Sequence, residues 1–299
     1  MTSPAQTMRR AVANPWGKPR YLPLITGLYV LWSLIPVVIA VRFSFNSGRS
    51  RSVWQGFSTR WYLGEPAAGE SIIYDQSLRF ALAQSLRLAV LTMLVATPIG
   101  VALAIGLARW RGRGARSSNF LMLFPLVTPE IVMGVALFLV FSSVFDFVSF
   151  GTHAQFLGHV TFSISFVVII VRGRLFSIGR DYEEAAMDLG ASPWEAMRRV
   201  LLPLLAPALL ASFAIVFALS IDDFVISQFL VAGADTVTIP VRLYSGARLA
   251  PPPSLNALAT MLMVFTIAAV TIAGLLYRWV GKRLGSADSA LETVGRFEI

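Results

Sequence analysis

Three carboxylates within apolar segments, Glu130, Asp222 and Asp223, are the side chains that most plainly offer chemistry. An ionised group at membrane depth is costly, and such residues usually face a protein interior or a water-filled path where they bind something. No Lys or Arg lies deep in the same segments, and unpaired carboxylates favour a cation. The sequence therefore predicts a path for a cationic small molecule. Two alternatives stay open for Asp222 and Asp223: a hydrogen bond to backbone at a helix end, or contact with an outer receptor.

Other kinds of chemistry have little support in the composition. The 299-residue chain has no Cys, which excludes thiol catalysis and thiolate metal sites. Its two His residues, His153 and His159, are expected in an outer loop or at an interface, away from the deep acids. Neither an HExxH motif nor a GxxxxGKS/T phosphate loop is present. We therefore expect no enzyme, no cofactor and no metal site, with a membrane enzyme as the less favoured alternative.

The elements that must carry the acids are long apolar helices. Hydrophobic residues make up 56% of the chain and charged residues 14%, against about a quarter charged in a soluble domain. A helix needs roughly 20 residues to cross the hydrocarbon core. The candidate spans are Leu22–Val41, Ser85–Ala108, Phe120–Phe145, Phe156–Ile178, Pro207–Ala232 and Asn256–Val280. These predict an all-α polytopic membrane protein with six transmembrane helices.

One domain at 21–281 is expected, between a tail at 1–20 and a tail at 282–299. The first tail lacks the features of a signal peptide and is expected to be retained. Lys and Arg gather in both tails and after the second and fourth spans, which predicts that both termini are cytoplasmic. The net charge of +9 has the same origin, and nucleic-acid binding is not favoured.

The depth of each acid follows from its place in its span. Glu130 would lie about 15 Å into the third span, near the midplane, where Pro125 and Pro129 would break the helix. Asp222 and Asp223 would lie roughly 22 Å into the fifth span, in its outer half. Neighbouring helical residues point about 100° apart, so at most one of this pair should face the path squarely.

The loop between the first two spans, at 43–77, carries Arg residues against the general charge pattern. Its aromatic residues suit an interfacial belt and a contact with a partner equally well. They are Trp54, Phe57, Trp61 and Tyr62.

A polar loop at 181–203 separates the fourth and fifth spans and is predicted to contain two short helices. Asp181 could cap the first helix, with Glu184 in the capping-box position, and Gly190 suits the left-handed residue after its end. Ser192 and Glu195 predict a capping box at the second helix. Two capped helices would form a rigid projection that transmits force, whereas the alternative is an amphipathic helix on lipid headgroups.

The spacing of this loop resembles the EAA loop of ABC-importer permeases. That motif reads EAA, three residues, Gly, nine residues, Ile, any residue, Leu-Pro, and every spacing agrees here. The only departure is Val200 in place of Ile. The matching residues are Glu184, Ala185, Ala186, Gly190, Leu202 and Pro203.

The resemblance implies a type I ABC importer fold, similar to the MetI permease, with a cytoplasmic coupling helix that docks on an ATPase. The expected coupling residues are Glu183, Glu184, Ala185, Ala186, Gly190, Leu202 and Pro203. Small Ala residues permit close approach, and Glu184 can accept charge-assisted hydrogen bonds. The implied partners are a second permease subunit, a dimer of ATPase subunits, an extracytoplasmic substrate-binding protein and the lipid of a bacterial inner membrane.

Further motifs are similar to spermidine/putrescine permeases, and especially to the second of their two permease subunits. These motifs are FSFNSGRSRSVWQG at 43–56, FSTRWY at 57–62, TPEIVM at 128–133, HVTF at 159–162, LSIDD at 219–223 and NALAT at 256–260. The resemblance implies import of a polyamine. Related importers for ferric iron, opines or aminophosphonates share much of the pattern and stay open, as does a secondary transporter that works without ATP.

Overall fold

The computed structural model describes residues 21–50, 52–64, 71–110, 112–247 and 252–283. Within these ranges the regular structure is helical, apart from one isolated bridge between Asn46 and Phe57, and short turns and loops join the helices. The helices are α2 (Tyr21–Ser44), α3 (Arg60–Leu63), α4 (Gln76–Arg109), α5 (Ala115–Val127), α6 (Glu130–Ser143), α7 (Thr152–Ile178), α8 (Asp181–Asp188), α9 (Pro193–Ala196), the π-helix η2 (Met197–Leu201), α10 (Leu202–Asp222), α11 (Val225–Phe229), the 3-10 helix η3 (Ala234–Thr236), α12 (Ile239–Ala247) and α13 (Pro253–Arg283).

Five helical stretches in the described part of the chain are long and apolar enough to cross a membrane. They are α2, α4, α7, the continuous run Pro193–Asp222 and α13. A sixth span results if the bent pair α5 and α6 is counted as one. The prediction of an all-α, multi-span protein is therefore confirmed.

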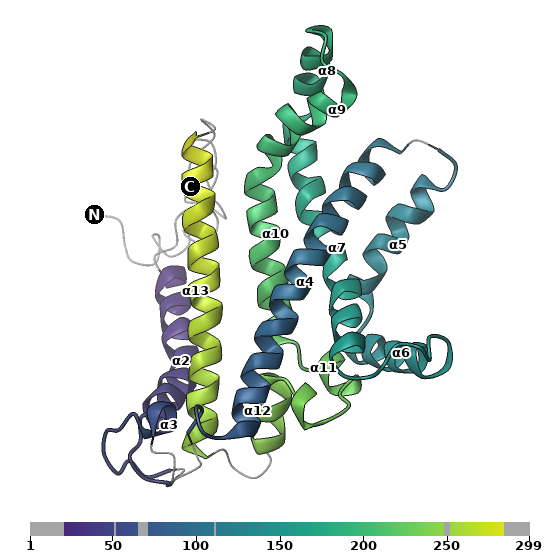
Figure 1. The fold of residues 1–299 in the computed structure, drawn as a ribbon. Coiled ribbons are helices and arrows are strands. Elements are labelled where there is room, and N and C mark those ends of the chain that lie inside the picture. The colour runs from purple at the N-terminus through teal and green to yellow at the C-terminus, as the bar shows by residue number, and fades with distance from the viewer. Residues whose placement is uncertain (1–20, 51, 65–70, 111, 248–251, 284–299) are drawn as a thin grey trace, which may run out of the picture.

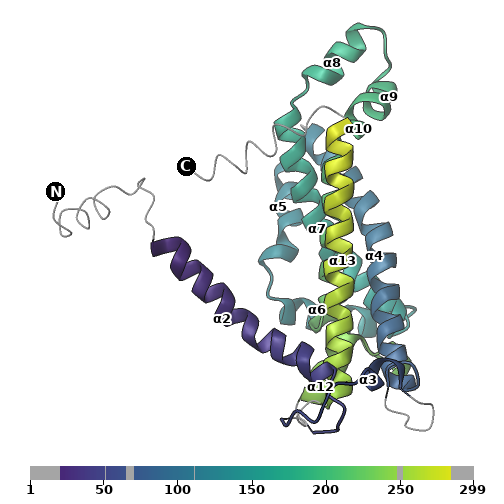
Figure 2. The ribbon, with the colours of Figure 1, turned by 90° about the vertical axis from the view of Figure 1, so that its left-hand side faces the viewer.

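The centre of the bundle is formed by α4, α7 and α10, which pack against one another over much of their length (Figure 1). Their shared core is aliphatic and includes the fully buried Ala104, Val167, Leu201, Leu205 and Val216. The helix α13 lies along α10, and α2 packs on α13 but leans away from the rest of the bundle (Figure 2). Since α2 is apolar and almost wholly exposed, it needs lipid or a second protein around it.

Gly100 lies at a close contact between α4 and α7, because a Cβ at this position would be 2.6 Å from Cβ of Val167. Overpacking of a close-packed core typically costs about 1–3 kcal/mol. We expect Gly100→Leu to lower the free energy of unfolding by about that amount, measured by SDS titration of the purified chain in mixed micelles. Gly106 of the same helix has nothing within 4 Å of the place that a Cβ would occupy, and it supplies the control Gly106→Leu. Equal losses in the two variants would contradict this account of the α4–α7 contact.

The third predicted span, Phe120–Phe145, is broken at Pro129, one of the two prolines expected to break it. The chain breaks at Thr128 and Pro129, and α5 and α6 meet at an angle of 108°. Both break residues have extended ψ angles, of 128° and 134°. A proline disfavours helical geometry in the residue before it and has no N–H to donate, which explains the break at Pro129. Pro125, expected to break the helix as well, is accommodated inside α5.

The fifth predicted span, Pro207–Ala232, is also displaced. The helical run begins upstream at Pro193 and ends at Asp222, after which the short helix α11 follows. Pro203 therefore lies in the first turn of α10 and does not separate the polar loop from the span. Pro203 cannot donate to the carbonyl of Arg199, and the backbone widens into the π-helix η2 just before it.

The segment between α2 and α4 is held in place by its own polar and aromatic side chains. Trp61 is only 2% exposed, and its Nε1 donates to the carbonyl of Asn46 at 2.5 Å. The guanidinium of Arg42 lies 4.9 Å from the ring centroid of Trp54. Phe57, by contrast, is 73% exposed. Part of the aromatic content predicted to be a belt or partner contact thus stabilises the segment itself.

The expected limits of the domain, 21–281, stay a prediction. Both expected tails lie outside the described residues, except that residues 282 and 283 continue α13.

Candidate functional site

The predicted coupling loop and the predicted path residues lie toward opposite ends of the bundle. The helices α8 and α9 project beyond it at one end, while α3, α6, α11 and α12 lie at the opposite end (Figure 1). The two broken spans, α5–α6 and α10–α11, meet at this second end, where α6 packs against α11.

A cavity of about 810 Å³ opens beside these breaks. It is lined by α6, α7, the end of α10, the start of α11, and α13. All three predicted path residues, Glu130, Asp222 and Asp223, contribute to its wall. The rest of the lining is mainly apolar and includes Phe162, Phe166, Phe224, Leu219 and Met263.

Glu130 and Asp222 are exposed and lie next to the two breaks. Glu130 is the first residue of α6, directly after the bend, and Asp222 is the last residue of α10. Neither carboxylate has a hydrogen bond or ion pair with another residue that the structure describes. The two acids therefore remain available to a charged or hydrogen-bonding molecule in the cavity.

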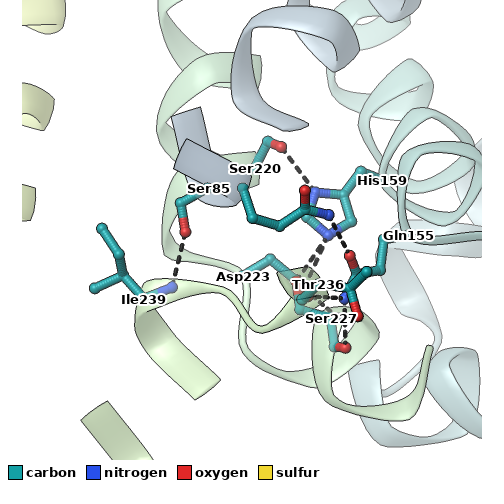
Figure 3. A network of polar contacts seen from close by, with 9 residues as sticks. Ser85, Gln155, His159, Ser220, Asp223, Ser227, Thr236 and Ile239 are labelled. Atoms are coloured by element: carbon teal, nitrogen blue, oxygen red, sulfur yellow. Dashed lines mark hydrogen bonds and ion pairs between the residues drawn. The ribbon is translucent and has the colours of Figure 1, made fainter. Parts of the chain in front are cut away.

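Asp223 has a different environment, shown in Figure 3. Its side chain is 10% exposed, and Oδ2 lies 3.2 Å from Nε2 of His159. The same oxygen accepts a hydrogen bond of 2.8 Å from the backbone N–H of Ser227 in α11. Asp223 thus shows the alternative role left open for this pair, a hydrogen bond to backbone at a helix end.

The expectation that His159 lies away from the deep acids is wrong. The helix α7 begins at Thr152, so His159 is well inside it, with a side chain only 1% exposed. Its Nδ1 is 2.7 Å from the hydroxyl of Ser220, and its Nε2 is 3.1 Å from the hydroxyl of Ser227. His153, near the start of the same helix, is exposed and contacts Ser149.

Two glutamines extend this polar network and were not singled out from the sequence. Gln155 donates to the carbonyls of Ser227 and Thr236 at 3.0 Å each, and it accepts from Gln84 of α4 at 2.8 Å. Both are almost fully buried. The sequence could have indicated Gln155, because it lies four residues before His159 and so on the same face of an apolar helix. Buried polar groups on one face need hydrogen-bond partners.

At the other end, α8 carries acids in its first turn, Asp181, Glu183 and Glu184, where they suit the helix dipole. The predicted cap at Asp181 is wrong, because the capping position is Arg180 and Asp181 is already helical. Gly190 has a φ of +91°, which confirms its left-handed conformation after the helix end.

The start of α9 is confirmed in detail. The Ser192 hydroxyl accepts from the N–H of Glu195 at 3.3 Å, and the Glu195 carboxylate accepts from the N–H of Ser192 at 3.1 Å, which together form the capping box. On the α8 side the N–H groups of Gly190 and Ala191 donate to the carbonyls of Met187 and Ala186, so hydrogen bonds hold the turn on both sides of Gly190.

The projecting loop exposes apolar side chains: Leu189 is 90% exposed, Trp194 63% and Tyr182 58%. Glu184 and Ala185 are exposed and Ala186 is half-buried beside them. Glu183 instead forms an ion pair with Arg109 in the last turn of α4. Leu202 and Pro203 are half-buried in α10 and lie away from the projection. The structure therefore groups five of the seven predicted coupling residues on α8 and its end.

The fold is similar to that of chains in solved ABC transporters. A chain of a bacterial ABC transporter involved in the import of the acidic polysaccharide alginate aligns with a TM-score of 0.68 at 15% identity, covering 86% of this chain and 95% of that one. A chain of the MetNI methionine transporter aligns with a TM-score of 0.57 at 18% identity, covering 69% and 95%. At these identities the likeness shows the fold, which is the type I importer fold expected from the sequence.

The sequence comparisons agree. The model of the family described as "Binding-protein-dependent transport system inner membrane component" matches residues 96–286. The putrescine transport permease PotI of Escherichia coli K12 is 34% identical over 270 residues, covering 89% of this chain and 90% of the relative. The spermidine/putrescine permease PotC of the same strain is 35% identical over 254 residues, covering 85% and 92%.

A more distant relative, the molybdenum transport permease ModB of Mycobacterium bovis, is 31% identical over 274 residues and covers 87% of this chain and 94% of the relative. The chain belongs to the family of binding-protein-dependent transport system inner membrane components, and it is a multi-pass permease subunit of an ABC importer. The resemblance to polyamine-type permeases is confirmed.

Proposed function

We propose that this chain forms part of the inner-membrane path of an importer for a cationic amine of the putrescine or spermidine class. The observation that carries this proposal is the pair of carboxylates, Glu130 and Asp222, at two helix breaks that face one cavity without a counter-charge among the described residues. Unpaired carboxylates beside a path favour a bound cation over an anion.

The wall between the acids suits an amine better than a metal ion. Polyamines combine ammonium groups with short alkyl chains, and the cavity wall combines carboxylates with aromatic and aliphatic side chains. The ring centroids of Phe162 and Phe166 are 5.2 Å apart in an edge-to-face arrangement, and both rings offer cation–π contacts to an ammonium group. The mixed polar and apolar lining of the cavity thus favours an organic cation as cargo over ferric iron.

The conformational change driven by ATP hydrolysis is proposed to reach this chain through α8. The loops at its end of the bundle are rich in Lys and Arg, which supports a cytoplasmic position for this end, and we propose the same side for both termini. Exposed apolar residues on a rigid, capped projection favour a protein partner, which we take to be one of two ATPase subunits. A second permease subunit and an extracytoplasmic binding protein would complete the importer, since α2 and the far side of the cavity are open.

A competition experiment tests the proposed cargo. The complete importer is reconstituted in proteoliposomes, and uptake of radiolabelled putrescine is measured with a tenfold excess of unlabelled spermidine, an opine, an aminophosphonate, ferric citrate or molybdate. Spermidine is expected to reduce uptake several-fold, and the other compounds are expected to have no effect. Absence of putrescine uptake, together with uptake of one of the other compounds, would contradict the cargo class.

A further inference from the structure

The His159 ring bridges the two sides of the break between α10 and α11. On one side Nδ1 contacts the hydroxyl of Ser220, which belongs to α10. On the other side Nε2 contacts the hydroxyl of Ser227 in α11 and the carboxylate of Asp223. The ring is thus held by partners that precede and follow Asp223 in the chain (Figure 3).

We propose that His159 is a positioning residue: paired with Asp223, it fixes the break between α10 and α11, so that Asp222 is the carboxylate of this pair that binds the cargo. The proposal rests on the proposed function for the identity of the cargo. In this proposal Asp222 binds the cargo, and the adjacent Asp223 positions the backbone.

The first argument is the burial of the pair. The Asp223 side chain is 10% exposed and that of His159 is 1% exposed, so neither group has much access to water. A buried carboxylate is costly unless hydrogen bonds and an opposite charge or a polar donor compensate it. Asp223 obtains both kinds of contact within the chain, from the Ser227 N–H and the His159 ring. Both contacts are made by Oδ2 and hold this carboxylate within the chain, which leaves the exposed Asp222 as the freer of the two acids.

The second argument is the geometry of the break. Asp223 has φ −64° and ψ 121°, which ends α10, although neither Gly nor Pro is present at the break. Asp suits such a boundary, and its carboxylate accepts from the N–H of Ser227 four residues on. Contacts from α7 add tertiary support to this local one. His159 and Gln155, one helical turn apart on α7, supply contacts to residues 220, 223, 227 and 236.

The consequence is a division of roles. Asp222 has no hydrogen bond or ion pair within the described ranges, is exposed and lines the cavity, whereas Asp223 anchors the backbone that presents it. Loss of Asp222 should weaken cargo binding. Loss of one member of the His159–Asp223 pair should instead reduce the fraction of importer able to turn over.

A double-mutant cycle distinguishes these roles. His159→Gln, Asp223→Asn and the double variant are made in the full chain, assembled with the partner subunits, and assayed for putrescine uptake and for thermal unfolding in detergent. Each single variant is expected to lower the maximal uptake rate at least tenfold with less than a threefold change in KM. The double variant replaces the pair with two amides that can hydrogen-bond each other, and it is expected to recover at least a third of the wild-type rate.

Two outcomes overturn the proposal. One is a raised KM for Asp223→Asn with the maximal rate kept and no recovery in the double variant, which would make Asp223 a direct cargo ligand. The other is that the two single effects add up in the double variant, in both uptake rate and unfolding temperature. Failure of the double variant to assemble, as well as of both single variants, would count in the same way, because it shows no recovery. The unfolding arm needs no cargo, so failure of wild-type putrescine uptake would contradict the proposed function while the cycle still tests the pair.

Discussion

Charge reversal at Glu184 combined with bulky replacements at Ala185 and Gly190 is expected to lower ATP-driven uptake at least about 100-fold, equivalent to about 2.7 kcal/mol. Glu184 and Ala185 are exposed on the projecting helix, and a larger side chain there would separate the loop from a close-fitting partner. Any residue with a Cβ at Gly190 is strained at a φ of +91°, although nothing lies within 4 Å of that position. The bundle should remain folded, because α8 projects beyond it.

The measurement is uptake into proteoliposomes together with co-purification of the ATPase subunit, for the triple variant Glu184→Lys, Ala185→Trp, Gly190→Val. A control at the same end of the bundle is Arg116→Glu, which reverses one exposed charge in the first turn of α5. The control is expected to keep its ATPase and its transport. Full attachment of the ATPase and unchanged import by the triple variant would show that α8 is not the coupling surface.

Replacement of the free carboxylate in the cavity is expected to have the second large effect. Asp222→Asn should raise the KM for putrescine at least tenfold, because it removes one of the unpaired charges that attract the cation. Asp222→Lys should abolish uptake, since it places a like charge beside the ammonium groups of the cargo. Basal ATP hydrolysis should persist in both variants, because Asp222 ends α10 at the opposite end of the bundle from α8.

The matched control is Asp146→Asn, which removes an exposed acid from the turn between α6 and α7, outside the cavity lining. It changes the net charge of the chain by the same amount, so a general charge effect would appear in both variants. Uptake kinetics of Asp222→Asn that match those of wild type would remove Asp222 from the path.

The sequence alone predicted the features that depend on local composition. Long apolar runs indicated the spans, and the fixed spacing from Glu184 to Pro203 indicated the loop that the structure shows projecting from the bundle. The break at Pro129 had a local cause and was partly anticipated. All three acids found in apolar segments line one cavity, as the cost of placing a charge in a membrane indicates.

The features that escaped prediction depend on contacts between distant residues. The end of α10 at Asp222 has no proline or glycine to mark it, and the contact of Asp223 with His159 of α7 could not be read from the local sequence. His159 was misplaced because α7 was expected to begin at Phe156 and begins at Thr152, so that the His was expected near the edge of the membrane. Hydropathy windows average over such positions and do not reveal which buried polar groups meet.

The most direct test of the account is ATP-dependent putrescine uptake by the complete importer, with the binding protein outside the proteoliposomes and ATP inside. We predict rapid uptake that disappears when the ATPase subunits or ATP are omitted, and that falls at least about 100-fold with the triple variant of the α8 loop. Putrescine movement by this chain without ATPase subunits, or uptake that continues undiminished without ATP, would contradict the account.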